Sequence, residues 1–250
     1  MTMECEWPTA PEAGTMAVGG PDFESKVLRY AVIGSSAVFE GDIVLSEDVH
    51  LEGLGITGVG FRWADATVPY EIDPALPDPH RVHDAIAHWE ANTRIRFVAR
   101  TPDHVDFVRF RPGPGCSSMV GKHGGRQHIT LGTACRTGNV IHEIGHAIGL
   151  WHEQSRADRE ARVEIRFANI DPAAAHNFDQ HIADGDDLGA YDFGSIMHYP
   201  RQAFSSNGGD TVVPRQPLPP GVVMGQRTAL SAGDIAAVHA LYPLDDTVVV

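Results

Sequence analysis

The stretch from residue 142 to residue 153 reads HEIGHAIGLWHE, and it determines how the rest of the chain is interpreted. The pattern predicts a helix over residues 139–150. His142 and His146 are four residues apart, so both side chains project from one helix face. A glycine at position 149 ends a helix abruptly because it tolerates a positive φ, and the chain then returns His152 toward the other two histidines. Three imidazoles that converge in this way are typical of a zinc site.

Glu143 lies beside the first of these ligands, where it can hold and deprotonate a water bound by the metal. Three histidines leave the fourth position of a tetrahedral zinc open, which is typical of a catalytic rather than a structural site. A bare HExxH pattern also occurs by chance on ordinary amphipathic helices. In that alternative the apolar residues of the stretch only supply a core face. Gly149 and His152 at the spacing HExxHxxGxxH favour zinc.

Charge and hydropathy exclude two classes of partner. The 250 residues include 19 basic and 33 acidic side chains, which give a net charge of −14, and residues 1–62 hold three of the basic and ten of the acidic ones. An acidic surface repels a phosphate backbone, so we expect no nucleic-acid partner. No apolar run approaches the length of a membrane span. Residues 1–20 contain no recognisable signal peptide, since they show neither a basic region nor an apolar one.

The chain divides into an acidic N-terminal part and a larger mixed part. Residues 1–25 are rich in Pro, Gly and acids, so we expect them to be poorly ordered. Short apolar stretches between residues 30 and 51 indicate an extended segment that lies on the rest of the protein. Local patterns predict further strands at residues 67–72, 95–98, 105–110 and 127–131, a loop at 111–125, and helices around 82–89 and 231–242. Strands and helices mix without a βαβ rhythm, so the fold class is α+β.

Two stretches resemble the astacin family of metzincin zinc endopeptidases, and the whole chain resembles a bacterial-type proastacin. The two stretches are HEIGHAIGLWHEQSRADR at residues 142–159 and SIMHY at residues 195–199. Weaker matches extend from Trp63 toward the C-terminus. The resemblance implies a metzincin-like zincin with an upper mixed-sheet subdomain that carries the active-site helix. A lower loop-rich subdomain then contains a C-terminal helix. It also implies one catalytic Zn2+ that serves the hydrolysis of extended polypeptides.

The second stretch implies two further site residues. By resemblance, Met197 forms an apolar floor beneath the zinc, and Tyr199 is a fifth, displaceable zinc ligand that stabilises the oxyanion. Taken alone, Met197 would be a core residue and Tyr199 a packed aromatic. We interpret His198, between them, as structural rather than as a ligand.

The cysteines imply one disulfide. The family pattern pairs Cys116 with Cys135, and the alternative is two free thiols. The family usually has a second bridge, whose positions align with Arg94 and Leu244 in this chain, so that bridge is absent. Cys5 stands alone in the N-terminal segment, and we interpret it as a free thiol.

The motif FEGD at residues 39–42 resembles the propeptide signature of the family. The resemblance implies an inhibitory propeptide at residues 1–53 and a catalytic domain at residues 54–250. In such proenzymes the Asp42 carboxylate takes the place at the metal that the catalytic water needs. A carboxylate is a good zinc ligand, and tethering gives it a high effective concentration. The alternative is an ordinary Gly-Asp turn.

The family pattern also bears on activation and specificity. It implies that a new N-terminus is buried near Glu153 after cleavage. Residues 30–61 contain neither Lys nor Arg, so a trypsin-like activator has no site there, and cleavage after Arg62 leaves too short a terminus. We therefore expect cleavage before an acid such as Glu47 or Glu52. Arg227 resembles a basic residue that favours acidic side chains after the cleaved bond, although a structural role is equally compatible with its motif.

Two alternatives belong to other classes. One is a catalytically silent, zinc-bearing protein-binding module, against which the intact Glu143 argues. The other is a different metzincin subfamily such as the serralysin type, which the FEGD and SIMHY segments fit less well. The expected partners are a polypeptide substrate and the chain's own propeptide. We expect a monomer in a secreted or extracytoplasmic location.

Overall fold

The computed structural model describes residues 12–20, 23–47, 61–180 and 187–244. Its strands are β1 (Glu12–Gly20), β2 (Phe23–Ile33), β3 (Ser36–Phe39), β4 (Ile43–Ser46), β5 (Thr67–Ile72), β6 (Arg96–Ala99), β7 (Phe107–Pro112), β8 (Cys116–Ser118), β9 (Arg126–Leu131), β10 (Val163–Ile165) and β11 (Val212–Pro214). The helices are α1 (His80–Asn92), α2 (Thr137–Ala147) and α3 (Ala232–Leu241). Short 3₁₀ segments lie at Ala64–Ala66, Glu153–Ser155, Arg159–Ala161, Phe167–Asn169 and Pro172–Phe178.

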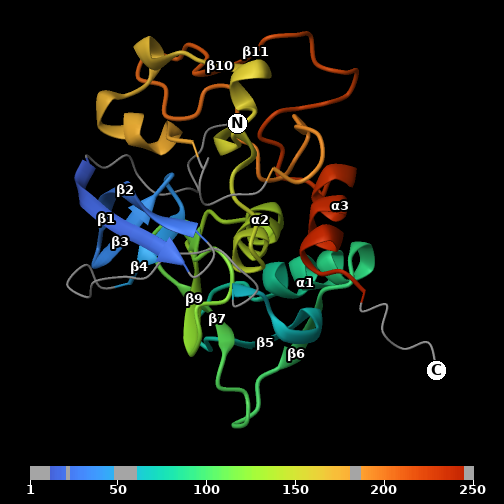
Figure 1. Cartoon of the computed structure of the whole chain (residues 1–250). Coiled ribbons are helices and arrows are strands. Elements are labelled where there is room, and N and C mark those ends of the chain that lie inside the picture. The colour runs from blue at the N-terminus through green and yellow to red at the C-terminus, as the bar shows by residue number, and fades with distance from the viewer. Residues whose placement is uncertain (1–11, 21–22, 48–60, 181–186, 245–250) are drawn as a thin grey trace.

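One mixed sheet carries most of the strands. Its order is β1-β2-β3-β4-β8-β9-β7-β5-β6, so the N-terminal strands β1–β4 continue a sheet that β5–β9 build. Strand β8 is antiparallel to β9, whereas the pairs β9–β7, β7–β5 and β5–β6 are parallel. Figure 1 shows β1–β4 in blue beside this sheet, and β10 and β11 apart from it in a second, loop-rich region. The α+β class and the mixed-sheet subdomain are thus confirmed.

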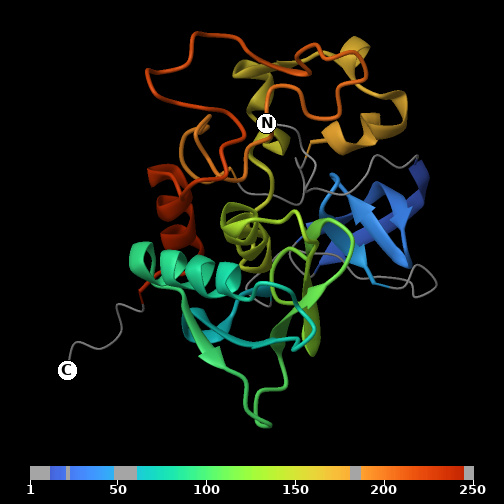
Figure 2. The same cartoon turned by 180° about the vertical axis from the view of Figure 1, so that it is seen from behind.

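Helices α1 and α2 pack against each other on the sheet (Figure 2). The predicted face of α1 is buried, with Val82 and Trp89 fully inaccessible. The Trp89 indole Nε1 donates to the carbonyl of Ile141 on α2 at 3.0 Å, which joins the two helices. Because α2 lies between the sheet and the loop-rich region, its residues can face both. No helix among the described residues is long and apolar enough to cross a bilayer.

Helix α3 stabilises the loop-rich subdomain, residues 151–244, through its N-terminus. Ser231 is the N-cap, as predicted, and its hydroxyl accepts from the amide of Asp234 at 2.9 Å. The Asp234 carboxylate in turn accepts from the Ser195 hydroxyl at 2.6 Å and from the Ile196 amide at 2.9 Å. A capping residue of α3 therefore fixes the turn that contains Met197.

The structure differs from two predictions of local order. Part of the segment expected to be poorly ordered, residues 1–25, forms β1 and the start of β2. These strands pair with each other over Gly14↔Tyr30 to Gly20↔Phe23, and the backbone hydrogen bonds of that pairing, which composition does not report, order the segment. The predicted loop at residues 111–125 contains β8, which is too short for an alternating pattern. The predicted boundary at residues 53 and 54 lies outside the described residues, as does Cys5.

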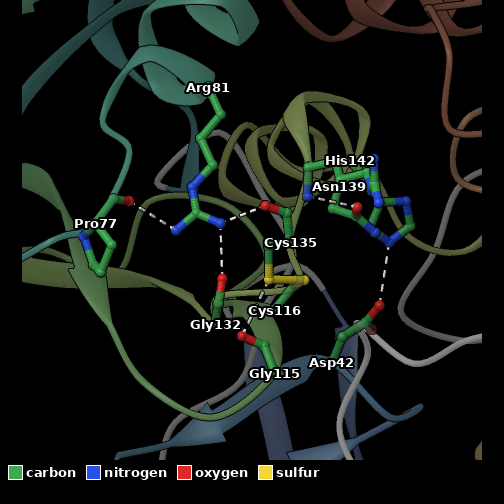
Figure 3. The surroundings of a disulfide bond; sticks show 10 residues. Asp42, Pro77, Arg81, Gly115, Cys116, Gly132, Cys135, Asn139 and His142 are labelled. Atoms are coloured by element: carbon green, nitrogen blue, oxygen red, sulfur yellow. Dashed lines mark hydrogen bonds and ion pairs between the residues drawn. A yellow bond between two sulfur atoms is a disulfide. The ribbon is translucent and has the colours of Figure 1, made fainter.

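The predicted disulfide between Cys116 and Cys135 is present. Figure 3 shows it beside Arg81, whose buried guanidinium donates to the carbonyls of Gly132 at 2.7 Å, Pro77 at 3.2 Å and Cys135. The bridge and the arginine together hold the loop that leads into α2.

At the position of the missing second bridge, the Arg94 guanidinium donates to the carbonyl of Tyr242 at 2.6 Å. A hydrogen bond thus connects the end of α1 with the end of α3, although no covalent link does.

Removing the disulfide should lower stability because the bridge closes a loop with a sequence separation of 19. Loop-closure entropy predicts a loss of about 3 kcal/mol in the free energy of unfolding for the Cys116→Ala, Cys135→Ala double variant. Urea denaturation of the oxidised wild type and the variant measures it, with reduced wild type as the control. Equal stability of the double variant and the oxidised wild type would show that the bridge adds nothing.

Candidate metal centre

Helix α2 and the turn after it bring the three histidines together. His142 and His146 lie one turn apart on α2, which ends at Ala147, three residues earlier than predicted. Gly149 has a φ of 114°, the positive value predicted for it, and the chain turns there toward His152. All three imidazoles are at most 1% exposed. The predicted convergence of the histidines is therefore present in the structure.

Four donor atoms surround a single point. The Nε2 atom of His142 lies 3.2 Å from that of His146 and 3.3 Å from that of His152. The Asp42 Oδ2 atom lies 3.2 Å from His142 Nε2, and the Oδ1 atom lies 3.3 Å from His152 Nε2 and 3.6 Å from His146 Nε2. A tetrahedron with metal–ligand bonds of about 2.0–2.1 Å has edges of about 3.3–3.4 Å. The observed separations therefore match a tetrahedral zinc site.

The outer nitrogens determine the tautomers of the two helical histidines. His142 Nδ1 lies 2.9 Å from the carbonyl oxygen of Ile196, and His146 Nδ1 lies 2.8 Å from that of Leu150. Because a carbonyl oxygen only accepts, each Nδ1 carries the proton and each Nε2 directs a lone pair toward the shared point. Burial lowers the pKa of both imidazoles, so both are neutral, which is the form that binds a metal.

Asp42 and His152 carry the charge at this centre. Burial alone would raise the pKa of Asp42 and lower that of His152. The histidines outweigh burial and hold the pKa of Asp42 well below its usual range. Likewise the carboxylates of Asp42 and Glu40 raise the pKa of His152 to about 10. A metal at this site competes with the His152 proton, as it does wherever histidine is a ligand.

One buried oxygen indicates that a cation belongs here. Asp42 is 1% exposed, and its Oδ1 makes no hydrogen bond to any described residue. It nevertheless faces the Nε2 atoms of His146 and His152. A buried acceptor without a donor is costly, whereas a metal ion would satisfy it. The donor set of three imidazoles and one carboxylate fits Zn2+.

Glu143 and Met197 flank the histidines. Glu143 follows His142 on α2 and is fully buried. Met197 is 2% exposed, and its Sδ lies 2.6 Å from the point that a Cβ at Gly145 would occupy. The thioether therefore lies directly against α2 at Gly145, and a larger residue at that position would force the Met197 side chain to move. The predicted role of Met197 as an apolar floor beneath the zinc stays a prediction.

The segment at residues 39–42 contributes a second acid that the sequence interpretation missed. The Glu40 carboxylate accepts from His152 Nδ1 at 2.8 Å and from the Ser155 hydroxyl. The Glu40 backbone carbonyl accepts from the Tyr199 hydroxyl. The only sequence signal was an acid inside the FEGD motif itself. Glu40 thus engages the third histidine and the predicted fifth ligand at once.

Comparisons with known proteins agree with this geometry. A model of the astacin family of peptidases matches residues 57–243. The chain belongs to the astacin family. A similar solved structure is high choriolytic enzyme 1, a hatching enzyme zinc-protease of the medaka Oryzias latipes. It is 35% identical, has a TM-score of 0.68, and the match covers 75% of this chain and 96% of that one.

Two curated relatives of this astacin are zinc metalloproteinases or proteases by name. Zinc metalloproteinase nas-13 of Caenorhabditis elegans is 38% identical over 186 residues, which cover 72% of this chain and 41% of the relative. Blastula protease 10 of Paracentrotus lividus is 37% identical over 234 residues, which cover 83% and 39%. This astacin therefore matches about two fifths of the length of each of these relatives.

Three acids of the astacin line one cavity below the metal centre. Glu153, Asp192 and Asp234 share it with Met197. Glu153 accepts from the Asp192 amide at 2.7 Å, and Arg156 lies 3.5 Å from its carboxylate. Burial nevertheless raises the pKa of Glu153 to about 8. In the full chain the residues that line this cavity thus include three acids and no lysine or arginine.

Two other predicted residues have backbone partners. His198 is buried, and its ring forms hydrogen bonds with the Tyr191 hydroxyl at 2.8 Å and with the Tyr199 carbonyl. Burial lowers the pKa of His198 to about 4. The four clustered donors are Asp42, His142, His146 and His152. Arg227 Nη1 donates to the carbonyls of Ile196 at 2.8 Å and His198 at 3.2 Å. These bonds give Arg227 a structural role, and its predicted effect on specificity stays a prediction.

Replacement of Glu153 should change how the stability of this astacin depends on pH. In the unfolded chain a glutamate titrates near pH 4.3, whereas here it titrates at about 8. Between these values the folded chain holds a proton that the unfolded chain releases, so the free energy of unfolding falls as pH rises. Glu153→Gln removes this loss, which we expect to be on the order of 3 kcal/mol between pH 5 and pH 8.

Urea denaturation at the two pH values measures the difference. Glu160→Gln is the matched control, since the Glu160 side chain is 58% exposed. An identical pH slope in wild type and Glu153→Gln would contradict the assignment.

Proposed function

We propose that this astacin is a zinc-dependent endopeptidase made as a latent proenzyme. The observation that carries the proposal is the cluster of three histidine Nε2 atoms, two of them on the helix that also carries Glu143. A propeptide residue holds the fourth ligand position, so this position opens when that residue leaves. An open place at a zinc is what distinguishes a catalytic site from a structural one.

The chemistry divides between the metal and the chain. When bound, zinc supplies a Lewis acid that polarises the scissile carbonyl and activates water. Glu143 accepts a proton from the attacking water and returns it to the leaving amine. The Tyr199 hydroxyl donates a hydrogen bond to the developing oxyanion once it is released from the Glu40 carbonyl. Bonds from the outer nitrogens keep His142 and His146 in the required tautomer throughout.

Strand β8 supplies the surface for an extended substrate. It is the edge strand of the part of the sheet that β5–β9 form, and β4 covers it in the full chain. The contact consists of the bridge Ile43↔Ser118 and a bond from the Ser118 amide to the Asp42 carbonyl at 3.0 Å. A polypeptide that replaces β4 can add to the same edge by its backbone.

Several contacts support latency. Asp42 occupies the fourth ligand place, and Glu40 holds Tyr199 and His152 through its carbonyl and carboxylate. Farther from the metal, the Arg29 guanidinium on β2 lies 2.8 Å from the Asp179 carboxylate. This ion pair attaches the β1–β2 hairpin to the loop-rich subdomain. Inhibition thus combines a ligand at the metal with a strand on the substrate edge.

Activation would remove this segment and supply the charge that the acidic cavity lacks. A new N-terminal ammonium at Glu153 would lower the pKa of that carboxyl and pair with it. The predicted cleavage before Glu47 or Glu52 remains a prediction, and Glu52 lies outside the described residues. N-terminal sequencing of the activated protein tests it, and a terminus at Trp63 would contradict it.

Glu143→Gln should separate metal binding from catalysis. The amide keeps the shape of the side chain but cannot accept the proton, so we expect kcat on casein to fall by about 10²–10⁴-fold. Zinc content, measured by atomic absorption, should stay at one ion per chain. Loss of zinc in the variant, or full activity without the carboxylate, would contradict the assigned role of Glu143.

Asp42→Ala should weaken latency. Loss of a tethered carboxylate opens the fourth ligand place, so we expect the unprocessed chain to hydrolyse casein about tenfold faster or more. The fully processed protein, which lacks residue 42, provides the reference rate. Asp103→Asn, at an exposed position, is the matched control and should stay latent. Unchanged latency in Asp42→Ala would show that another contact blocks the site.

A further inference from the structure

The outer face of the sheet carries a group of basic side chains. On β7 and β9 the residues Val108, Phe110 and Ile129 are buried in the core. Because side chains alternate along a strand, Arg109 and Arg111 on β7 and Arg126 and His128 on β9 lie on the opposite face. A basic group is unusual in a chain with a net charge of −14.

Glu47, the residue after β4, places its carboxylate on two members of this group. Its Oε1 lies 2.5 Å from His128 Nδ1 and 3.8 Å from Arg111 Nη2. The His128 ring hydrogen bonds with the carboxylate while only 10% of its side chain is exposed. The Ser35 hydroxyl bonds the Glu47 carbonyl at 3.0 Å and positions the residue.

The neighbouring carboxylates of the sheet form ion pairs with a different arginine. Arg109 pairs with Glu71 at 3.0 Å and with Asp73 at 2.8 Å. For Arg111 and His128, Glu47 is the single carboxylate within ion-pair distance among the side chains of residues 12–16, 27–47, 61–180 and 187–244. When Glu47 leaves, these two donors therefore lose their acid and remain on adjacent, rigid strands.

We propose that His128 and Arg111 form a carboxylate-binding site, which Glu47 fills in the full chain and an acidic side chain of the polypeptide substrate fills after activation. This inference rests on the proposed function, since it requires removal of residues before the catalytic domain. It assigns to the enzyme a preference for an acid several residues away from the scissile bond. That position is distinct from the one predicted for Arg227.

The path of the propeptide supports this occupant. From Asp42 at the metal centre the chain follows β4 to Glu47, five residues farther on. A polypeptide that replaces β4 at the β8 edge leaves the metal centre by the same surface. A side chain at a comparable separation then reaches Arg111 and His128. The Arg111 side chain is positioned by a hydrogen bond that its Nε donates to the Thr130 hydroxyl at 3.2 Å.

The first test measures binding without catalysis. A fluorescent peptide that copies residues 36–47 is titrated into the processed protein, and its affinity is compared with that of the same peptide bearing Glu47→Gln. We expect the Gln peptide to bind about three- to tenfold more weakly. In Arg111→Gln and His128→Gln the two peptides should bind alike. Arg166→Gln is the matched control, an exposed arginine with one carboxylate partner on the other subdomain.

Equal affinity of the two peptides for the processed wild type would overturn the site. So would an unchanged Glu-over-Gln ratio in both site variants. Because Arg111 lies on the surface, with 35% of its side chain exposed, Arg111→Gln tests the site even if His128→Gln does not fold.

The second test uses hydrolysis. In a set of peptides with one common cleavable sequence, a single Glu is moved along an otherwise Gln-substituted flank. One Glu position should lower KM by about three- to tenfold, and Arg111→Gln should abolish that gain, whereas Arg166→Gln should retain it. A gain that persists in Arg111→Gln, or no gain at any position, would overturn the inference. Failure to cleave even the all-Gln peptide would instead contradict the proposed function.

Discussion

The convergence of three Nε2 atoms on one point is the constraint on which the remainder of the structure depends. Three buried imidazoles can share one metal ion only if each directs a lone pair, not a proton, toward the centre. The carbonyls of Ile196 and Leu150 enforce that tautomer for two of them. Asp234, through the turn at residues 195–197, fixes the first of these carbonyls, so α3 contributes to the metal site without touching it. Cys116, Cys135 and Arg81 fix the other end of α2.

The N-terminal strands use the same surfaces that catalysis needs. Strand β4 covers the β8 edge, Asp42 takes a ligand place, and Glu40 engages Tyr199. Each contact resembles one that a substrate or a water would make, so in the proposed proenzyme this one short segment would block the site. The uneven charge of the chain also acquires a physical meaning, since Arg29 and Glu47 connect the segment to opposite charges on the two subdomains.

The sequence predicted the parts of the site that short-range spacing encodes. The histidines, Glu143 and the glycine at 149 lie within eleven residues, and helix geometry alone brings the ligands together. Family resemblance added Asp42, whose contact with His142 spans one hundred positions. The contact between Glu40 and His152 escaped prediction because it depends on the path of β4 across the sheet. The pairing of β1 with β2 escaped for the same reason, since composition does not report a strand's partner.

The position of Asp42 relative to the metal tests this account most directly. A crystal structure of the zinc-loaded full chain, with anomalous scattering recorded at the zinc edge, locates the ion independently of the protein atoms. We predict one zinc bound by the Nε2 atoms of His142, His146 and His152 and by an Asp42 oxygen, each at about 2.0–2.2 Å. A zinc whose fourth ligand is water, with the Asp42 carboxylate turned away, would contradict the proposed latency.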